Sequence, residues 1–95
     1  MSDVRRESKV EKEGNDYAKR RGWKVMKFVS PALRAVPDRL YLRETNGVFR
    51  CVFIEWKRPG EVPTEQQMKR GRDIQASGAE WYWADCLEDV KDVLY

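Results

Sequence analysis

The chain has 95 residues, with 19 lysines and arginines against 16 aspartates and glutamates, a net charge of +3, and no histidine. The lack of histidine excludes Ser-His-Asp and Cys-His nucleophilic sites and histidine-based zinc sites, so any hydrolytic chemistry must use carboxylates, lysine and a metal ion. The mild basic excess permits a nucleic-acid partner without proving one.

The length fits one small domain over residues 1–95, with no internal repeat. Cys51 and Cys86 lack the paired spacing of a disulfide framework or zinc knuckle, and we interpret them as small buried residues of a reducing compartment. No apolar run approaches membrane-spanning length, and the N-terminus is too charged for a signal peptide. We therefore expect a cytoplasmic protein with no membrane partner.

A first helix is predicted over residues 3–21, because good helix formers dominate and Gly22 stands where a C′ glycine would. Gly14 costs roughly 1 kcal/mol relative to alanine inside a helix, a cost that close approach of a sheet or a phosphate backbone would explain. Glu7 and Glu11 lie one turn apart on one side. They form either a solvated acidic stripe or a pair of which one member reaches a metal ion.

A first strand is predicted over residues 23–29, with Lys27 on the same face as apolar residues. We interpret this lysine as the mark of a polar patch. Residues 30–36 are predicted to form a loop, in which Arg34 either contacts a phosphate or is simply solvated.

A hairpin is predicted over residues 38–57, because Asn46-Gly47 separates two β-rich runs and a type I′ turn needs positive φ at both central residues. If these two residues form the turn, counting back along both arms places Asp38 opposite Glu55. Directly opposed side chains share one face of the sheet, with Cβ atoms roughly 5 Å apart. The second arm is apolar on both faces, which is typical of a central strand.

Two opposed carboxylates repel each other, so stability alone does not favour the Asp38–Glu55 pair. A bound divalent cation offsets this repulsion, since hard cations bind clustered carboxylate oxygens. Lys57 lies two residues beyond Glu55 and projects from the same face. The pattern therefore predicts a metal-dependent phosphodiesterase site at a strand end, although charged residues in strands are common and a longer turn would shift the register.

A second helix is predicted from Thr64 to about Ala76, because Thr64 and Gln67 form a capping box. This gives Gln67 a structural role that competes with any catalytic one. A short strand follows over residues 80–84, and a second capping box at residues 85–88 predicts a final helix. That helix turns four apolar residues inward: Leu87, Val90, Val93 and Leu94. The order α-β-β-β-α-β-α predicts an α/β fold, a mixed central sheet flanked by helices.

These residues resemble the PD-(D/E)XK nuclease superfamily, and within it a stand-alone VRR-NUC domain of phage or bacterial type. The resemblance runs from about Glu7 to the end and implies a restriction-endonuclease-like core. Trp56 stands where the family usually has a small residue, and the strand alternation predicts that it packs on the opposite face. The matching segments are Glu7 to Lys12, Val36-Pro37-Asp38-Arg39-Leu40, Phe53-Ile54-Glu55-Trp56-Lys57, Pro59-Gly60, Pro63-Thr64 with Gln67, and Leu87-Glu88-Asp89-Val90.

The resemblance implies that Asp38 and Glu55 bind Mg²⁺ or Mn²⁺ and that Ile54 or Trp56 lends a backbone carbonyl. It also implies roles for three further residues: Lys57 is the catalytic lysine, Gln67 is the additional family glutamine, and Glu11, with Glu7 as the fallback, is the helix glutamate.

The implied activity is hydrolysis of DNA phosphodiester bonds by a homodimer that resembles a Holliday-junction resolvase. The alternatives are a flap- or nick-directed or restriction-like nuclease, a catalytically silent DNA-binding module, or an α/β interaction domain whose acidic pair is accidental. The candidate phosphate contacts are basic side chains around the site: Lys27, Arg34, Arg58, Lys69 and Arg70.

Overall fold

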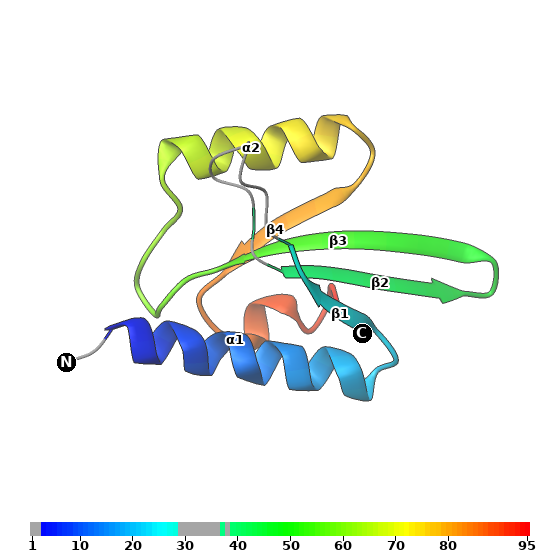
Figure 1. Cartoon of the computed structure of the whole chain (residues 1–95), viewed down its shortest axis with the longest axis horizontal. Helices are drawn as coiled ribbons and strands as arrows, with labels where there is room; N and C mark the ends of the chain where they lie inside the picture. The colour runs from blue at the N-terminus through cyan, green and yellow to red at the C-terminus, as the bar shows by residue number, and fades with distance from the viewer. Residues whose placement is uncertain (1–2, 29–36, 38) are drawn as a thin grey trace.

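A computed structural model describes residues 3–28, 37 and 39–95. It contains two α-helices, four strands and a short 3₁₀ helix, in an order that agrees with the prediction (Figure 1). The elements are α1 (Asp3–Arg20), β1 (Lys24–Lys27), β2 (Arg39–Thr45), β3 (Val48–Trp56), α2 (Glu65–Ala76), β4 (Glu80–Ala84) and η1 (Leu87–Val90).

The four strands form one mixed sheet in the order β1-β2-β3-β4, which confirms the α/β class and the central position of β3. The first three strands are antiparallel and β4 runs parallel to β3. Asn46 and Gly47 form the tight turn with φ values of 52° and 82°. The predicted register is confirmed from Thr45–Val48 to Arg39–Ile54. The next predicted pair includes Asp38, which lies outside the described residues.

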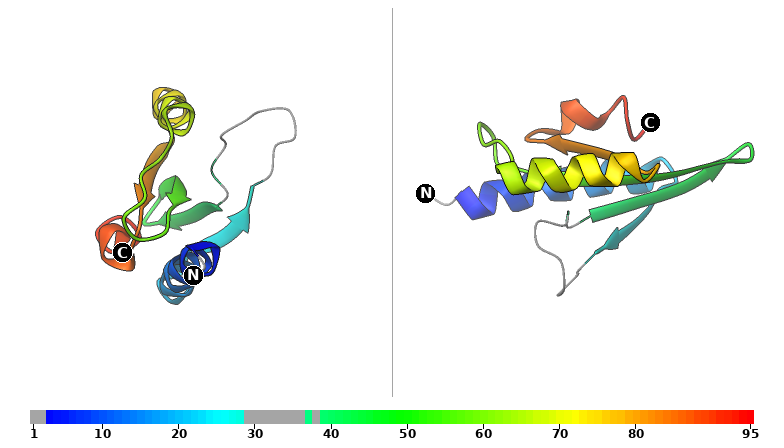
Figure 2. Two further views of the ribbon diagram at one scale, coloured as in Figure 1. Left: turned by 90° about the vertical axis from the view of Figure 1, so that its left-hand side faces the viewer. Right: turned by 90° about the horizontal axis from the view of Figure 1, so that it is seen from above.

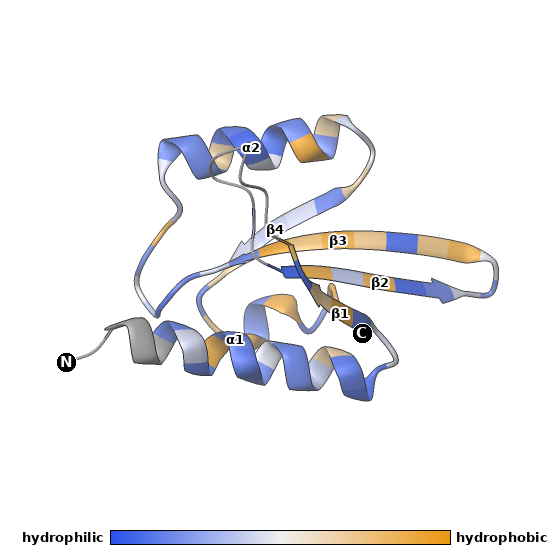
Figure 3. Ribbon diagram, viewed as in Figure 1, coloured by the Kyte–Doolittle hydropathy of each residue, from blue (hydrophilic) through white to orange (hydrophobic). Residues whose placement is uncertain are grey.

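The helices cover the two faces of the sheet unequally (Figure 2). On one face α1 and η1 pack over the sheet, and the side chains of Tyr41, Val52 and Ile54 are fully buried there. On the other face α2 packs against β4. Apolar residues run along β3, whereas most residues of both helices are hydrophilic (Figure 3). The fold therefore places its main core between the sheet and α1.

Two glycines allow the helices to approach tryptophan side chains of the sheet. A Cβ atom on Gly14 would lie 2.3 Å from the ring of Trp56, and one on Gly71 would lie 2.3 Å from the ring of Trp81. Both distances are far shorter than any real contact, so a methyl group at either position forces the ring to move. The expected close approach at Gly14 is confirmed, and the object approached is the sheet. Trp56 packs on the α1 side, as the strand alternation predicts.

The chain end departs from the predicted α-helix. Leu87–Val90 is a 3₁₀ helix with Cys86 at its N-cap and no side-chain capping bond, so the second capping box was a wrong prediction. The physical reason is that the Asp85 carboxylate accepts a hydrogen bond from the Gly60 amide at 2.9 Å instead. The inward packing is confirmed, because Val90 and Leu94 are fully buried and Leu87 and Val93 pack against the core.

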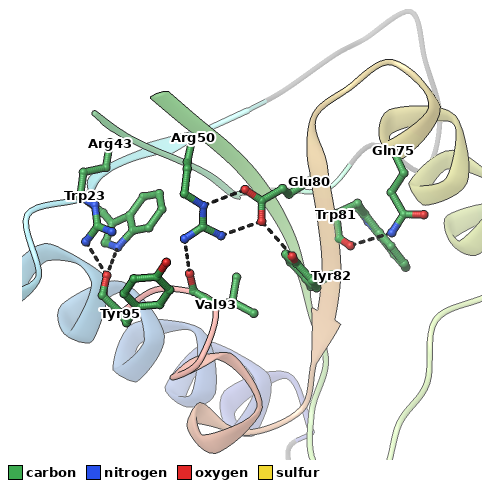
Figure 4. Close-up of polar contacts among 9 residues, drawn as sticks. All are labelled: Trp23, Arg43, Arg50, Gln75, Glu80, Trp81, Tyr82, Val93 and Tyr95. Atoms are coloured by element: carbon green, nitrogen blue, oxygen red, sulfur yellow. Dashed lines mark hydrogen bonds and ion pairs between the residues drawn. The ribbon is translucent and has the colours of Figure 1, made fainter. Parts of the chain in front are cut away.

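An ion pair joins the part of β3 near the hairpin turn to the start of β4 (Figure 4). Arg50 donates from Nε and Nη2 to the two carboxylate oxygens of Glu80 at 2.8 and 2.6 Å. The hydrogen bond from Arg50 lowers the pKa of the Glu80 carboxyl, and the reciprocal bond raises the pKa of Arg50. Bidentate pairs of this kind are among the stronger charge-assisted contacts in proteins.

Replacing Gly14 with alanine should destabilise the fold by about 2 kcal/mol, because the clash with Trp56 outweighs the roughly 1 kcal/mol gained in helix propensity. Urea unfolding measures the change. Ser8→Ala at an exposed position of the same helix is the control and should be neutral or slightly stabilising. A stabilised Gly14→Ala protein would contradict the packing described above.

The Arg50–Glu80 pair should make stability depend on pH in the acid range. A carboxyl whose folded-state pKa is depressed stabilises the protein above its unfolded pKa, about 4.3 for glutamate, and this contribution is lost as the pH falls through the folded pKa. Between about pH 5 and pH 3 the wild-type protein should therefore lose more stability than Glu80→Gln. Thermal unfolding across this range checks the prediction, and parallel curves for the two proteins would contradict it.

Candidate active site

Glu55 and Lys57 come together at the end of β3, on the face turned toward α2. Glu55 pairs with Trp83 of β4, and the Lys57 amide donates to the Ala84 carbonyl at 2.8 Å, which extends the parallel ladder beyond the strand. The two charged residues are only 8% and 7% exposed. Their ammonium and carboxylate groups lie 3.9 Å apart. Burial of charge is expensive and weak evidence for stability, so a buried pair at a strand end is a functional-site candidate.

Gln67 joins this pair from the first turn of α2. Its side-chain Nε2 donates to Glu55 Oε2 at 3.1 Å, while its Oε1 accepts from the Thr64 amide at 2.9 Å. The Gln67 amide in turn donates to Thr64 Oγ1 at 3.1 Å, which completes the predicted capping box. The two readings of Gln67 are therefore compatible. One end of its side chain caps the helix, and the other end is held against the carboxylate.

Glu11 occupies a different environment, on the α1 side of the sheet. Its carboxylate accepts a hydrogen bond from Arg39 Nε. Arg39 pairs with Ile54, so alternation places this ion pair on the face opposite to Glu55. The sequence predicts no site role for Arg39, although the same alternation that places Tyr41 toward α1 also places Arg39 there.

A buried polar chain lies beside this ion pair. The Trp56 indole N–H donates to the Tyr41 hydroxyl at 2.8 Å, and that hydroxyl donates to the Asn15 side chain at 2.5 Å. Burial raises the pKa of the Tyr41 phenol, so it remains a neutral hydrogen-bonding group. The tryptophan between Glu55 and Lys57 is thereby locked on the α1 side and leaves the other face open for its two neighbours.

The predicted phosphate contacts differ in their surroundings. Lys27 and Lys69 are exposed. Arg58 pairs with Glu61 at 3.3 Å, and Arg70 pairs with Asp73 at 3.5 Å. Arg34 lies outside the described residues. Lys69 lines a hollow of about 460 Å³ on α2, together with Pro63, Glu65, Met68 and Arg72.

A second acidic group is found near the chain end. Within the described ranges, Asp85, Cys86 and Asp89 form a group of three potential metal ligands whose donor atoms lie within 4.8 Å of one another. Two backbone amides explain its geometry, because Gly60 N–H donates to Asp85 and the Asp85 N–H donates to Asp89 at 3.4 Å. The spacing of these three residues in the sequence predicts no metal site, and the two hydrogen bonds account for their proximity.

Comparisons with known proteins agree with this architecture. No family model matches the chain. A protein of Acyrthosiphon pisum secondary endosymbiont phage 1, described as "Putative nuclease p44", is 36% identical over 89 residues, covering 94% of this chain and 91% of the phage protein. A solved structure described as a VRR_NUC domain superposes with a TM-score of 0.75 over 94% of both chains at 20% identity, which confirms the expected fold. Within the described residues, neither α-helix has the length and apolar character needed to cross a lipid bilayer. On this sequence and structural likeness, the chain belongs to the VRR-NUC domain family of the PD-(D/E)XK nuclease superfamily.

Proposed function

We propose that the protein is a Mg²⁺- or Mn²⁺-dependent endodeoxyribonuclease. The observation that carries the proposal is the buried Glu55–Lys57 pair, with the half-buried Gln67 bound to it, at one end of the sheet. A carboxylate, an ammonium group and an amide in contact supply a metal ligand, a positive charge for a phosphoryl oxygen and a positioning group. Membership of a nuclease family supports the same chemistry.

The donor set fits a hard divalent cation. The Glu55 carboxylate is buried. Its Oε2 lies 3.9 Å from Lys57 Nζ, which is longer than a normal hydrogen bond. In the proposal Asp38, Glu55 and the Trp56 backbone carbonyl hold the metal ion, since oxygen ligands are those that Mg²⁺ and Mn²⁺ prefer. When bound, the ion supplies Lewis-acid stabilisation of the scissile phosphate and a lowered pKa for water.

In this proposal the remaining side chains orient the reacting groups or support the metal ion. Lys57 orients the attacking water or stabilises charge on the phosphoryl oxygens, and its burial strengthens that interaction. Gln67 holds the Glu55 carboxylate in one orientation through its amide. Glu11, with Glu7 as the alternative, supports the metal site in this proposal. Glu11 pairs with Arg39 in the described structure, so it must leave that partner to take the role.

We further propose that the substrate is branched DNA, cut by a homodimer in the manner of a Holliday-junction resolvase. A two-fold dimer presents two equivalent sites to two strands of a junction. The phosphate contacts proposed for this substrate are Lys27, Arg34, Arg58, Lys69 and Arg70, and their sum makes binding salt-dependent. The proposed place of action is the cytoplasm of a bacterial or phage-infected cell, which the phage origin of the relative supports.

A flap- or nick-directed or restriction-like nuclease would use the same cluster on another substrate. A catalytically silent DNA-binding module is the alternative of a different class. The buried Glu55–Lys57 pair favours an enzyme, because a module that only binds has no need to keep two charges 8% and 7% exposed.

Strand cleavage with Mg²⁺ or Mn²⁺ on a labelled four-way junction, beside flap, linear duplex and single-strand substrates, tests the proposal. Paired symmetric nicks on the junction are expected. Lys57→Ala should lower the rate by about 10²–10³-fold, because it removes charge stabilisation at the reacting phosphate. Lys91→Ala, which removes a half-exposed lysine paired with Glu88, is the matched control and should leave the rate unchanged.

The outcomes separate the alternatives. Cleavage of flaps or duplex in preference to junctions would keep the active site and refute the resolvase assignment. DNA binding without cleavage of any substrate would favour the silent module. Cleavage that survives in Lys57→Ala would show that the activity comes from elsewhere.

Two variants of the capping box should separate the structural and positioning roles of Gln67. Thr64→Ala removes one capping bond and should destabilise the protein by about 1 kcal/mol, with little change in cleavage while it stays folded. Gln67→Glu keeps a residue suited to the capping box but replaces the amide donor to Glu55 with a second carboxylate. We expect a lower stability to urea without divalent metal, because two carboxylates then face each other, together with slower cleavage and an altered dependence of the rate on Mn²⁺ concentration. Unchanged cleavage in Gln67→Glu would limit this residue to helix capping.

A further inference from the structure

One face of the sheet is left open by the helices over most of its width. On this face α2 packs against β4, at one edge of the sheet, whereas α1 and η1 lie on the opposite face (Figure 2). The pairing register shows which side chains share the open face, because directly opposed residues point to the same side. In the described part of the chain this open face carries seven apolar residues: Met26, Phe28, Leu40, Leu42, Phe49, Cys51 and Phe53.

The seven side chains form a continuous patch. Leu40 lies opposite Phe53, and Leu42 lies opposite Cys51. The rings of Phe28 and Phe53 meet edge to face with centroids 6.0 Å apart, which places Phe28 in the same patch. None of the seven side chains is buried, so the described elements of the fold leave this apolar surface without a cover.

The patch is large for a protein of this size. Phe49 is 64% exposed, Met26 is 45% exposed and Phe28 is 37% exposed. A large apolar side chain offers roughly 200 Å² of surface, so these three expose about 300 Å² in total. The four half-buried members bring the sum to about 400–500 Å². Monomeric proteins rarely expose a contiguous apolar patch of more than a few hundred Å², and larger patches mark interaction sites.

The charges on this face favour a protein partner over a nucleic acid. Lys24 lies opposite Leu42 and Glu44 lies opposite Phe49, so β1 and β2 each place one charged side chain on the open face, and the two have opposite signs. Farther along β3 the same face carries the buried Glu55. DNA binding relies on several cations that neutralise phosphates, and a single lysine among carboxylates does not supply them.

The size and charge of the patch fit a second copy of the chain. A standard interface buries about 800 Å² on each partner, of which about 60% is apolar, or about 480 Å². The open face supplies an apolar area of this size. In a two-fold interface the same surface meets itself, so it must be self-complementary. An apolar centre with one lysine and one glutamate beside it meets that condition.

We propose that the open face is the homodimer interface, in which the seven apolar residues of two copies pack together with Lys24 and Glu44 at the rim. The identity of the partner as a second copy rests on the proposed function. Phe53 precedes Glu55 by two residues on the same face, about 7 Å along the strand, so the two candidate active sites of this dimer lie beside the interface. Two sites held in one assembly suit paired cuts in a branched substrate.

The test is sedimentation equilibrium of the whole chain over a range of protein concentrations, without DNA or divalent metal. Wild type should dimerise reversibly. Phe49→Glu places a charge in the apolar interface and should raise the dimer Kd by at least about 30-fold, the effect of losing an interface hot spot. Val48→Glu adds the same charge at the adjacent position, which is 61% exposed but on the opposite face, and should keep the wild-type Kd.

A second pair of variants covers the case in which Phe49→Glu unfolds. Met26→Glu probes the open face from β1, on the other side of the patch, and should also raise the dimer Kd. Met26→Leu keeps the apolar character and the volume of the side chain and should dimerise as wild type does. Circular dichroism and urea unfolding show which variants are folded.

The outcomes that would overturn the proposal are distinct from one another. They are a wild type that stays monomeric at every concentration, and equal dimer Kd values for the folded open-face variants and Val48→Glu. Weaker junction binding by Phe49→Glu with an unchanged dimer Kd would assign the face to nucleic acid and would also overturn it. Loss of the proposed nuclease function would appear only in the cleavage assay, because association is measured without DNA or metal, so the two failures are distinguishable.

Discussion

The alternation of side chains along β3 is the constraint on which the rest of this molecule depends. A strand turns successive residues to opposite faces, and toward the end of β3 residues on both faces are buried, from Ile54 to Trp56. One face carries Val52, Ile54 and Trp56, which form the core with α1. The other face carries Glu55, and Lys57 follows just beyond the strand. The same strand therefore supplies apolar core residues on one face and the charged residues of the candidate site on the other.

The helices are fitted to this strand by small residues and by caps. Gly14 lets α1 approach the Trp56 ring, and the indole N–H is bound by Tyr41, so the bulky residue inside the Glu-x-Lys motif is fixed away from its neighbours. On the other side the capping box that starts α2 also sets the orientation of Gln67. One side chain thus links the stability of a helix end to the position of the Glu55 carboxylate, and neither role can be changed without attention to the other.

The distribution of charge separates the two ends of the hairpin. Near the end of β3 a carboxylate and an ammonium group are buried together, which has little value for stability but gives strong electrostatic interactions in a dry site. Near the turn two arginines face each other; Arg50 is paired with Glu80, and Arg43 donates to the main-chain oxygen of Tyr95. The buried pair at the end of β3 is easier to explain by a charged ligand than by the core, whereas the arginines near the turn are held by groups of the protein itself.

Local sequence signals were sufficient to predict the order of elements, the hairpin register and the N-terminal cap of the second helix. Asn46-Gly47, the alternating arms and the Thr64–Gln67 spacing are local signals that depend on backbone geometry over a few residues. Tertiary structure decided the rest, because it depends on partners distant in the chain. The Asp85 carboxylate bonds to the Gly60 amide, so the final helix is a 3₁₀ turn. Glu11 is paired with Arg39, which separates it from Glu55, and Arg43 meets Trp23 and Tyr95. Local patterns specify which face a side chain occupies, whereas only packing in three dimensions specifies what it meets there.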